Sequence, residues 1–197
     1  ADRGWNVMST VREWVRNRYV SSVWLCTVVV LLLTGTLSVS GGPALGASFQ
    51  GIGTLPGDGV SVAYGISGDG QYVVGASDDQ AIRWHDGTMT GLGTLGCPIP
   101  SWSQAFGVSQ NGAHVVGASC NDGFIWTQTT GMQALSTKVG QVGSWWANAV
   151  SSQGDIVVGI NDAEDAFAWS SADGVISLGT LPGHDRAEGK GVHYSPP

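Results

Sequence analysis

Cysteine is the most reactive side-chain type in this sequence, and two of the three cysteines lie 23 residues apart, at Cys97 and Cys120. An expected hairpin near Gln110-Asn111 separates them, so a bridge between the two is geometrically feasible. It would close a loop of roughly 23 residues and stabilise the fold by about 3 kcal/mol in the chain-entropy model. Two free thiols are the alternative, because no neighbouring Cys or His has the spacing of a zinc site.

Acidic side chains gather in one polar loop, at Asp162, Glu164 and Asp165. Calcium binds oxygen ligands of this kind, so the three residues are a candidate calcium site. Their spacing matches no known calcium loop, and solvated turn acids are the commoner outcome. The sequence therefore predicts no cofactor, with calcium as the alternative.

Three tryptophans, Trp102, Trp145 and Trp146, fall outside the regular tryptophan positions described below. Exposed indoles can stack on sugar rings while nearby Asn and Asp side chains hydrogen-bond to the hydroxyl groups. These residues are therefore candidate ligand contacts of a carbohydrate-binding module. Packing of their large apolar area inside the fold is the alternative.

Catalytic motifs are missing from the sequence. The four histidines occupy unrelated positions, and neither a Gly-x-Ser-x-Gly elbow nor a His-Glu-x-x-His pair occurs. The acids recur at turns rather than forming one unique carboxylate pair. We therefore expect no enzyme, with a fragment of a propeller glycoside hydrolase or lyase as the alternative.

The elements that must position these residues repeat with a period of about 42 residues. Ala63-Tyr-Gly-Ile-Ser67 recurs as Ala105-Phe-Gly-Val-Ser109 and Ala147-Asn-Ala-Val-Ser151. A Val-Val-Gly triplet and a tryptophan keep nearly the same step, at Val73–Gly75, Val115–Gly117 and Val157–Gly159 and at Trp84, Trp126 and Trp169. Chance does not keep so many markers in phase.

Each unit alternates with period two, which indicates β-strands. Asp69-Gly70 and Asn111-Gly112 favour type I′ hairpin turns, in which both residues have positive φ. A second glycine turn follows in every unit, and no helix is expected after Ala47. The sequence predicts an all-β fold of tandem four-stranded antiparallel units, stacked as an incomplete β-propeller. The expected units span about 56–95, 96–138 and 139–181, with a partial unit at 182–197, inside a repeat domain of residues 48–197.

Residues 1–47 have the layout of a leader. Arg12, Arg16 and Arg18 precede an 11-residue apolar run, Val23–Leu33, and small residues near Ala47 suit a cleavage point. A cleaved signal peptide, helical in its apolar part, is the main interpretation. An uncleaved membrane anchor is the alternative, because about 20 apolar residues span a bilayer.

The charge balance excludes one class of partner. After Ala47 the chain carries 13 acids against four bases, so it lacks the positive charge that nucleic-acid binding needs. Together with the leader, this composition predicts a secreted, periplasmic or cell-surface protein whose membrane contact is limited to an uncleaved leader.

The units resemble the bacterial HAF family of probable extracellular repeat proteins, from residue 49 to about 192. The resemblance rests on Leu178–Gly183 (LGTLPG), Ala63–Gly70 (AYGISGDG) and the Val-Val-Gly triplets. Asp165–Trp169 (DAFAW) is similar to the family's naming segment, with Asp165 in place of histidine. The resemblance implies export and repeat architecture, and it transfers no catalytic residues.

The chain stops before a fourth unit is complete, which suggests a truncated or frame-shifted family member, or assembly between chains. Open strand edges and apolar faces predict self-association. The expected function is that of an exported, non-catalytic scaffold for binding or surface display, with an unidentified protein or glycan as partner.

Overall fold

The computed structural model describes residues 49–98, 100–140 and 143–193. The expected leader lies outside these residues, so the signal-peptide and anchor interpretations stay predictions. Within the described part of the chain, no helix combines the length and the apolar character needed to cross a bilayer.

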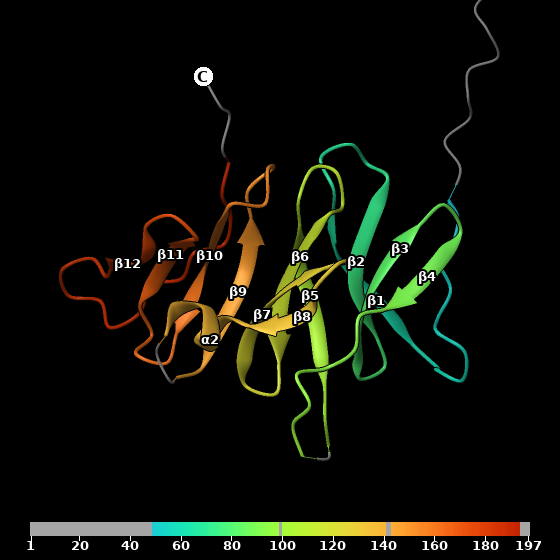
Figure 1. Ribbon diagram of the computed structural model, residues 1–197, viewed down its shortest axis with the longest axis horizontal. Helices are drawn as coiled ribbons and strands as arrows, with labels where there is room; N and C mark the ends of the chain where they lie inside the picture. The colour runs from blue at the N-terminus through green and yellow to red at the C-terminus, as the bar shows by residue number, and fades with distance from the viewer. Residues whose placement is uncertain (1–48, 99, 141–142, 194–197) are drawn as a thin grey trace, which may run out of the picture. The chain divides into compact units, whose positions relative to one another are not determined.

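Twelve strands in the described residues form three four-stranded antiparallel sheets, which follow one another along the chain (Figure 1). Each sheet keeps its strands in chain order. Sheet 1 consists of β1 (Ser61–Ile66), β2 (Tyr72–Ser77), β3 (Gln80–His85) and β4 (Thr88–Gly91). Sheet 2 consists of β5 (Ser103–Val108), β6 (His114–Ser119), β7 (Asp122–Thr127) and β8 (Gly131–Ala134). Sheet 3 consists of β9 (Trp145–Val150), β10 (Ile156–Asn161), β11 (Ala166–Ser170) and β12 (Gly174–Gly179).

The all-β class and the four strands in every unit are thus confirmed. The three sheets lie side by side, with β5 against β2 and β9 against β6 (Figure 1). The sequence period of about 42 residues therefore corresponds to one sheet in space.

The first hairpin turn of each unit differs from the type I′ expectation. Only its glycine has positive φ, 73° at Gly70, 70° at Gly112 and 87° at Gly154. A buried serine replaces the second left-handed residue as the organiser of the loop: Ser67 Oγ accepts the Tyr72 N–H at 2.9 Å and donates to Asp69 Oδ1. Because these bonds close a longer loop, one left-handed glycine is enough.

True two-residue turns with positive φ at both positions occur elsewhere. Cys120 and Asn121, with φ of 55° and 69°, join β6 to β7, and Asp86 and Gly87 join β3 to β4. The sequence placed the glycine turns correctly but assigned the type I′ geometry to the wrong hairpin.

The first strand of every unit carries a β-bulge at the same position. In sheet 1, Ala63 pairs with Gly75 and Gly65 pairs with Val74, which leaves Tyr64 unpaired. Phe106 and Asn148 are the bulged residues of β5 and β9. The bulge interrupts the simple alternation expected for this strand and turns one extra side chain out of the ladder.

A short helix, α2 (Leu135–Val139), follows β8 and corrects the expectation of no helix after Ala47. It begins without a capping bond from Ala134. Instead, the Asp122 carboxylate accepts the Ser136 N–H at 3.3 Å and the Ser136 hydroxyl. Gly140 ends the helix in the left-handed conformation, with φ of 68°.

Two hydrophobic clusters hold the three sheets together. One joins sheets 1 and 2, and the other joins sheets 2 and 3. Trp126 and Trp169 are buried in these clusters at 8% and 9% exposure, as expected for the in-phase tryptophans, whereas Trp84 of sheet 1 is only half-buried.

Candidate binding site beside Trp146

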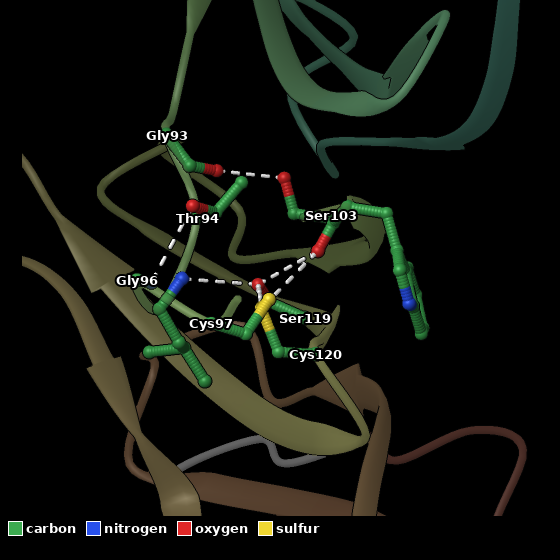
Figure 2. Close-up of a disulfide and its surroundings, with 9 residues drawn as sticks. Gly93, Thr94, Gly96, Cys97, Ser103, Ser119 and Cys120 are labelled. Carbon is green, nitrogen blue, oxygen red and sulfur yellow. Dashed lines mark hydrogen bonds between the residues drawn. A yellow bond between two sulfur atoms is a disulfide. The ribbon is translucent and has the colours of Figure 1, made fainter. Parts of the chain in front are cut away.

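The expected disulfide between Cys97 and Cys120 is present, with its two Cα atoms 5.7 Å apart (Figure 2). Cys97 belongs to the linker that enters sheet 2, and Cys120 lies in the turn between β6 and β7. The bridge thus fixes this linker to the turn that joins β6 and β7. A disulfide of this kind is typical of oxidising, extracytoplasmic compartments.

The linker beside the disulfide repeats a pattern that sequence analysis missed. Ser103 Oγ donates to the Gly93 carbonyl at 2.6 Å, and Ser119 Oγ accepts the Leu95 N–H at 3.0 Å (Figure 2). The linker into sheet 1 makes equivalent bonds, from Ser61 Oγ to Gly53 O at 2.6 Å and from Leu55 N to Ser77 Oγ at 3.0 Å. The Gly-Thr-Leu motif therefore anchors each of these linkers to the sheet that follows it.

The three candidate tryptophans separate in the structure. Trp145 is only 4% exposed and packs edge-on against Phe167 at 5.0 Å in the cluster between sheets 2 and 3. For Trp145 the structure therefore shows the packing alternative rather than an exposed indole. Trp146, its neighbour on β9, points the other way and is 40% exposed, and the half-buried Trp102 lies 6.1 Å from it between ring centroids.

An aromatic row crosses the first strands of the three sheets. Tyr64 meets Phe106 at 5.6 Å, and Phe106 lies nearly parallel to Trp146 at 6.3 Å. Two members of the row are the bulged residues of β1 and β5. The bulges thus place aromatic rings from separate sheets in contact with one another.

A pocket of about 350 Å³ opens at the Trp146 end of this row. Its apolar wall is formed by Trp146 and Ile160, and the rest of its lining is polar: Ser144, Asn161, Asp162, Glu164, Arg186, Glu188 and Lys190. An indole surrounded by amide, hydroxyl and charged groups is an arrangement that holds a polar ligand with an apolar face. Chemically, the pocket can supply stacking together with both donors and acceptors.

A small ion-pair network offsets part of the acidic charge of the pocket, whose lining holds three carboxylates and two cations. Arg186 lies 3.8 Å from Glu164 and 3.6 Å from Glu188, and Lys190 also pairs with Glu188. Partial burial raises the pKa of Glu188, but Lys190, Asn148 and Arg186 outweigh burial and bring that pKa below its ordinary value. Glu188 is therefore a carboxylate at neutral pH and serves as an acceptor.

The candidate calcium residues are divided between the pocket and its surroundings. Asp162 and Glu164 line the pocket, whereas Asp165 does not. Glu164 is paired with Arg186, which supplies the counter-charge that a bound cation would otherwise provide. In the described ranges, no group of three His, Cys, Asp or Glu side chains is gathered as a metal ion would need.

The pocket residues Arg186, Glu188 and Lys190 were not candidates from the sequence, because they belong to the segment that departs from the repeat pattern. The segment nevertheless stays in register with the sheets. The Ala187 N–H donates to the Glu164 carbonyl at 2.9 Å, and 84 residues earlier the Ser103 N–H donates to the Asp79 carbonyl at the same distance. The repeat period could have indicated where this segment lies, although the identities of its residues could not.

Comparison with protein-family models finds no match to the chain, and comparison with curated proteins also finds none. The resemblance to HAF repeats therefore remains a hypothesis based on the motifs.

Proposed function

We propose that the protein is an exported, non-catalytic β-repeat scaffold that binds a partner through the pocket beside Trp146. The observation that carries the proposal is that pocket, where β9, β10, the following loop and the C-terminal segment bring an exposed indole and polar side chains together. Export is supported by the leader sequence and by the Cys97–Cys120 disulfide. Membership of the HAF family and a propeller-like arrangement belong to the same proposal, supported by the period and the side-by-side sheets.

Carbohydrate is the ligand class that the pocket favours. A sugar ring has an apolar face that stacks on indole, and its hydroxyl groups match acceptors such as Asp162 and Glu188 and the amide of Asn161. Trp146 is backed by Phe106 at 6.3 Å and by Trp102 at 6.1 Å, so its indole is held in a fixed orientation by neighbouring rings. A pre-oriented aromatic surface lowers the entropy cost of binding.

A glycan array tests the proposal directly. We expect the wild-type chain to bind a defined set of glycans, Trp146→Ala to lose at least about tenfold in affinity, and Trp146→Phe to retain most of it. Val60→Ala, at an exposed apolar residue outside the pocket, is the control for general surface effects. Equal binding by Trp146→Ala would exclude the pocket, and turnover of a polysaccharide in a parallel activity screen would replace the scaffold with the glycosidase or lyase alternative.

A further inference from the structure

The two interfaces between the sheets are built from equivalent positions of successive units. Between sheets 1 and 2, Val74 and Leu92 meet Ala105, Val115 and Trp126. Between sheets 2 and 3, the residues one repeat later form the corresponding cluster: Val116, Leu135, Ala147, Val157 and Trp169. Each sheet thus has a front face, toward the preceding sheet, and a back face, toward the following one.

The front face of sheet 1 has the residues of such an interface, but no sheet among the described residues covers it. Ile66 is 64% exposed, whereas Val150, its equivalent in sheet 3, is 7% exposed. Trp126 of sheet 2 is covered by Arg83 of sheet 1, whose guanidinium lies 4.8 Å from the ring centroid. The equivalent Trp84 instead lines an open hollow of about 410 Å³.

The back face of sheet 3 has the residues of the opposite side of the same kind of interface, and it is also open. Leu178 is 57% exposed, although its equivalents Leu92 and Leu135 are buried at 6% and 0%. Leu181, which follows the Gly-Thr-Leu pattern of the linkers, is 74% exposed. The two open faces therefore hold the complementary residues of an interface that the chain already forms twice.

The C-terminal segment shows what kind of element this back face accepts. Besides the bond from Ala187 to Glu164, the Gly189 N–H donates to the Gly159 carbonyl of β10 at 3.0 Å. Asn148 also donates to the Gly189 carbonyl at 3.0 Å. The segment occupies the place that β5 takes on sheet 1, so it substitutes for the first strand of a following sheet and leaves Leu178 open.

We propose that a second copy of this chain packs the front face of its sheet 1 on the back face of sheet 3 and displaces the C-terminal segment. This head-to-tail contact is heterologous, so two copies close into a ring if both contacts form, and longer chains grow if they do not. The displaced segment includes Arg186, Glu188 and Lys190, which line the pocket beside Trp146. Self-association and ligand binding are therefore alternative uses of this end of the molecule.

Light scattering after size exclusion, over a range of concentrations, tests the contact with the full chain. We expect Ile66→Lys and Leu178→Asp each to weaken association at least about tenfold, because each buries an unpaired charge in the apolar contact. Ser171→Asp, in an exposed turn, is the charge-matched control for Leu178→Asp and should associate like the wild type. Circular dichroism of each variant identifies any that fail to fold.

A mixture of the two variants gives a result that misfolding cannot explain. Equimolar Ile66→Lys and Leu178→Asp should form a mixed complex, because Val108 and Leu92, the equivalents of these residues, share one cluster and the new charges are opposite. Ala187→Pro removes the N–H that holds the C-terminal segment and should strengthen association of the otherwise wild-type chain. A wild type that stays monomeric at all concentrations, or a mixture without the complex, would overturn the proposal.

Discussion

At the scale of single residues, short polar side chains organise this fold. Ser67 and Ser109 are buried at 3% and 0% exposure, and each closes its hairpin through its hydroxyl group. Asn111 fills in sheet 2 the place of Asp69 in sheet 1: its Oδ1 accepts from Ser109 Oγ and from the Ala113 N–H, each at 3.1 Å. The hairpin loops therefore keep one hydrogen-bond pattern while the charge of the accepting group varies.

Asp69 makes the free energy of unfolding depend on pH, whereas Asn111, which does not ionise, cannot. The hydrogen bond from Ser67, followed by that from the Gln71 N–H, lowers the pKa of Asp69 below its ordinary value of 3.8. Because the folded pKa lies below the unfolded one, this contribution is complete above pH 3.8 and is lost as pH falls through the folded pKa. We predict that Asp69→Asn flattens the acid limb of urea-unfolding stability between about pH 2 and pH 5.

Exposed Asp86→Asn is the matched control, since it removes one carboxylate from another turn of sheet 1. An acid limb that is the same in Asp69→Asn and the wild type would show that the Ser67 hydrogen bond does not favour the ionised carboxylate.

The residue-scale predictions from sequence succeeded where spacing alone was decisive. The disulfide followed from two cysteines on either side of one hairpin. The exposures of Trp145 and Trp146 did not follow from the sequence. Adjacent residues of a strand face opposite sides of the sheet, and only the register shows which of the two is buried. The pairing of Asn161 with Trp145 and of Ile160 with Trp146 fixes that register in the folded sheet.

At the scale of elements, the bulge explains the Val-Val-Gly triplet. A Cβ atom added to Gly75, Gly117 or Gly159 would lie 1.9, 2.0 or 1.8 Å from a carbonyl oxygen of the neighbouring first strand. The triplet was recognised from sequence as a repeat marker. Its cause, the close approach of a bulged backbone, could not be deduced because a bulge has no reliable signature in one sequence.

Gly117→Ala tests this explanation. We predict a loss of about 3 kcal/mol or more in unfolding free energy, because the Gln104 carbonyl is backbone and cannot move aside without opening β5. Gly59→Ala, where an added Cβ meets nothing within 4 Å, should change stability little. Equal stabilities of the two variants in urea unfolding would contradict the account.

The turn and helix errors have a related cause. Asp-Gly and Asn-Gly pairs fit type I′ turns by backbone preference, but a serine two residues earlier offers the loop a different set of hydrogen bonds. The helix α2 depends on the distant Asp122 carboxylate, which accepts the Ser136 N–H. The local sequence was enough to predict where the turns lie. Their type depended on hydrogen bonds from side chains, which the turn residues alone do not reveal.

At the scale of the whole molecule, sheet 2 is the only one of the three described sheets that has another sheet packed on each face. Val115 and Val116, adjacent on β6, are both fully buried, one in each cluster. We predict that backbone amides of β6 and β7 exchange with deuterium more slowly than those of β1 and β12, because local opening is cheapest where burial is least. Exchange as fast in β6 as in β12, measured by mass spectrometry, would show that the sheets do not stabilise one another.

The division into four-stranded sheets was largely accessible from sequence, because repeats copy one pattern and the copies kept their phase. The pocket beside Trp146 was only partly accessible. Its tryptophan and two of its acids were candidates, but Arg186 to Lys190 contribute through their position in the stack rather than through a recognisable motif.

The bulged positions Tyr64, Phe106 and Asn148 offer a route to engineering. Each of these residues lacks a cross-strand partner in the ladder, so exchanging it should preserve strand register. Randomising these three codons together would yield a combinatorial library that varies one bulged position in each sheet. Selection from that library would turn a naturally repetitive chain into a source of tailored recognition reagents.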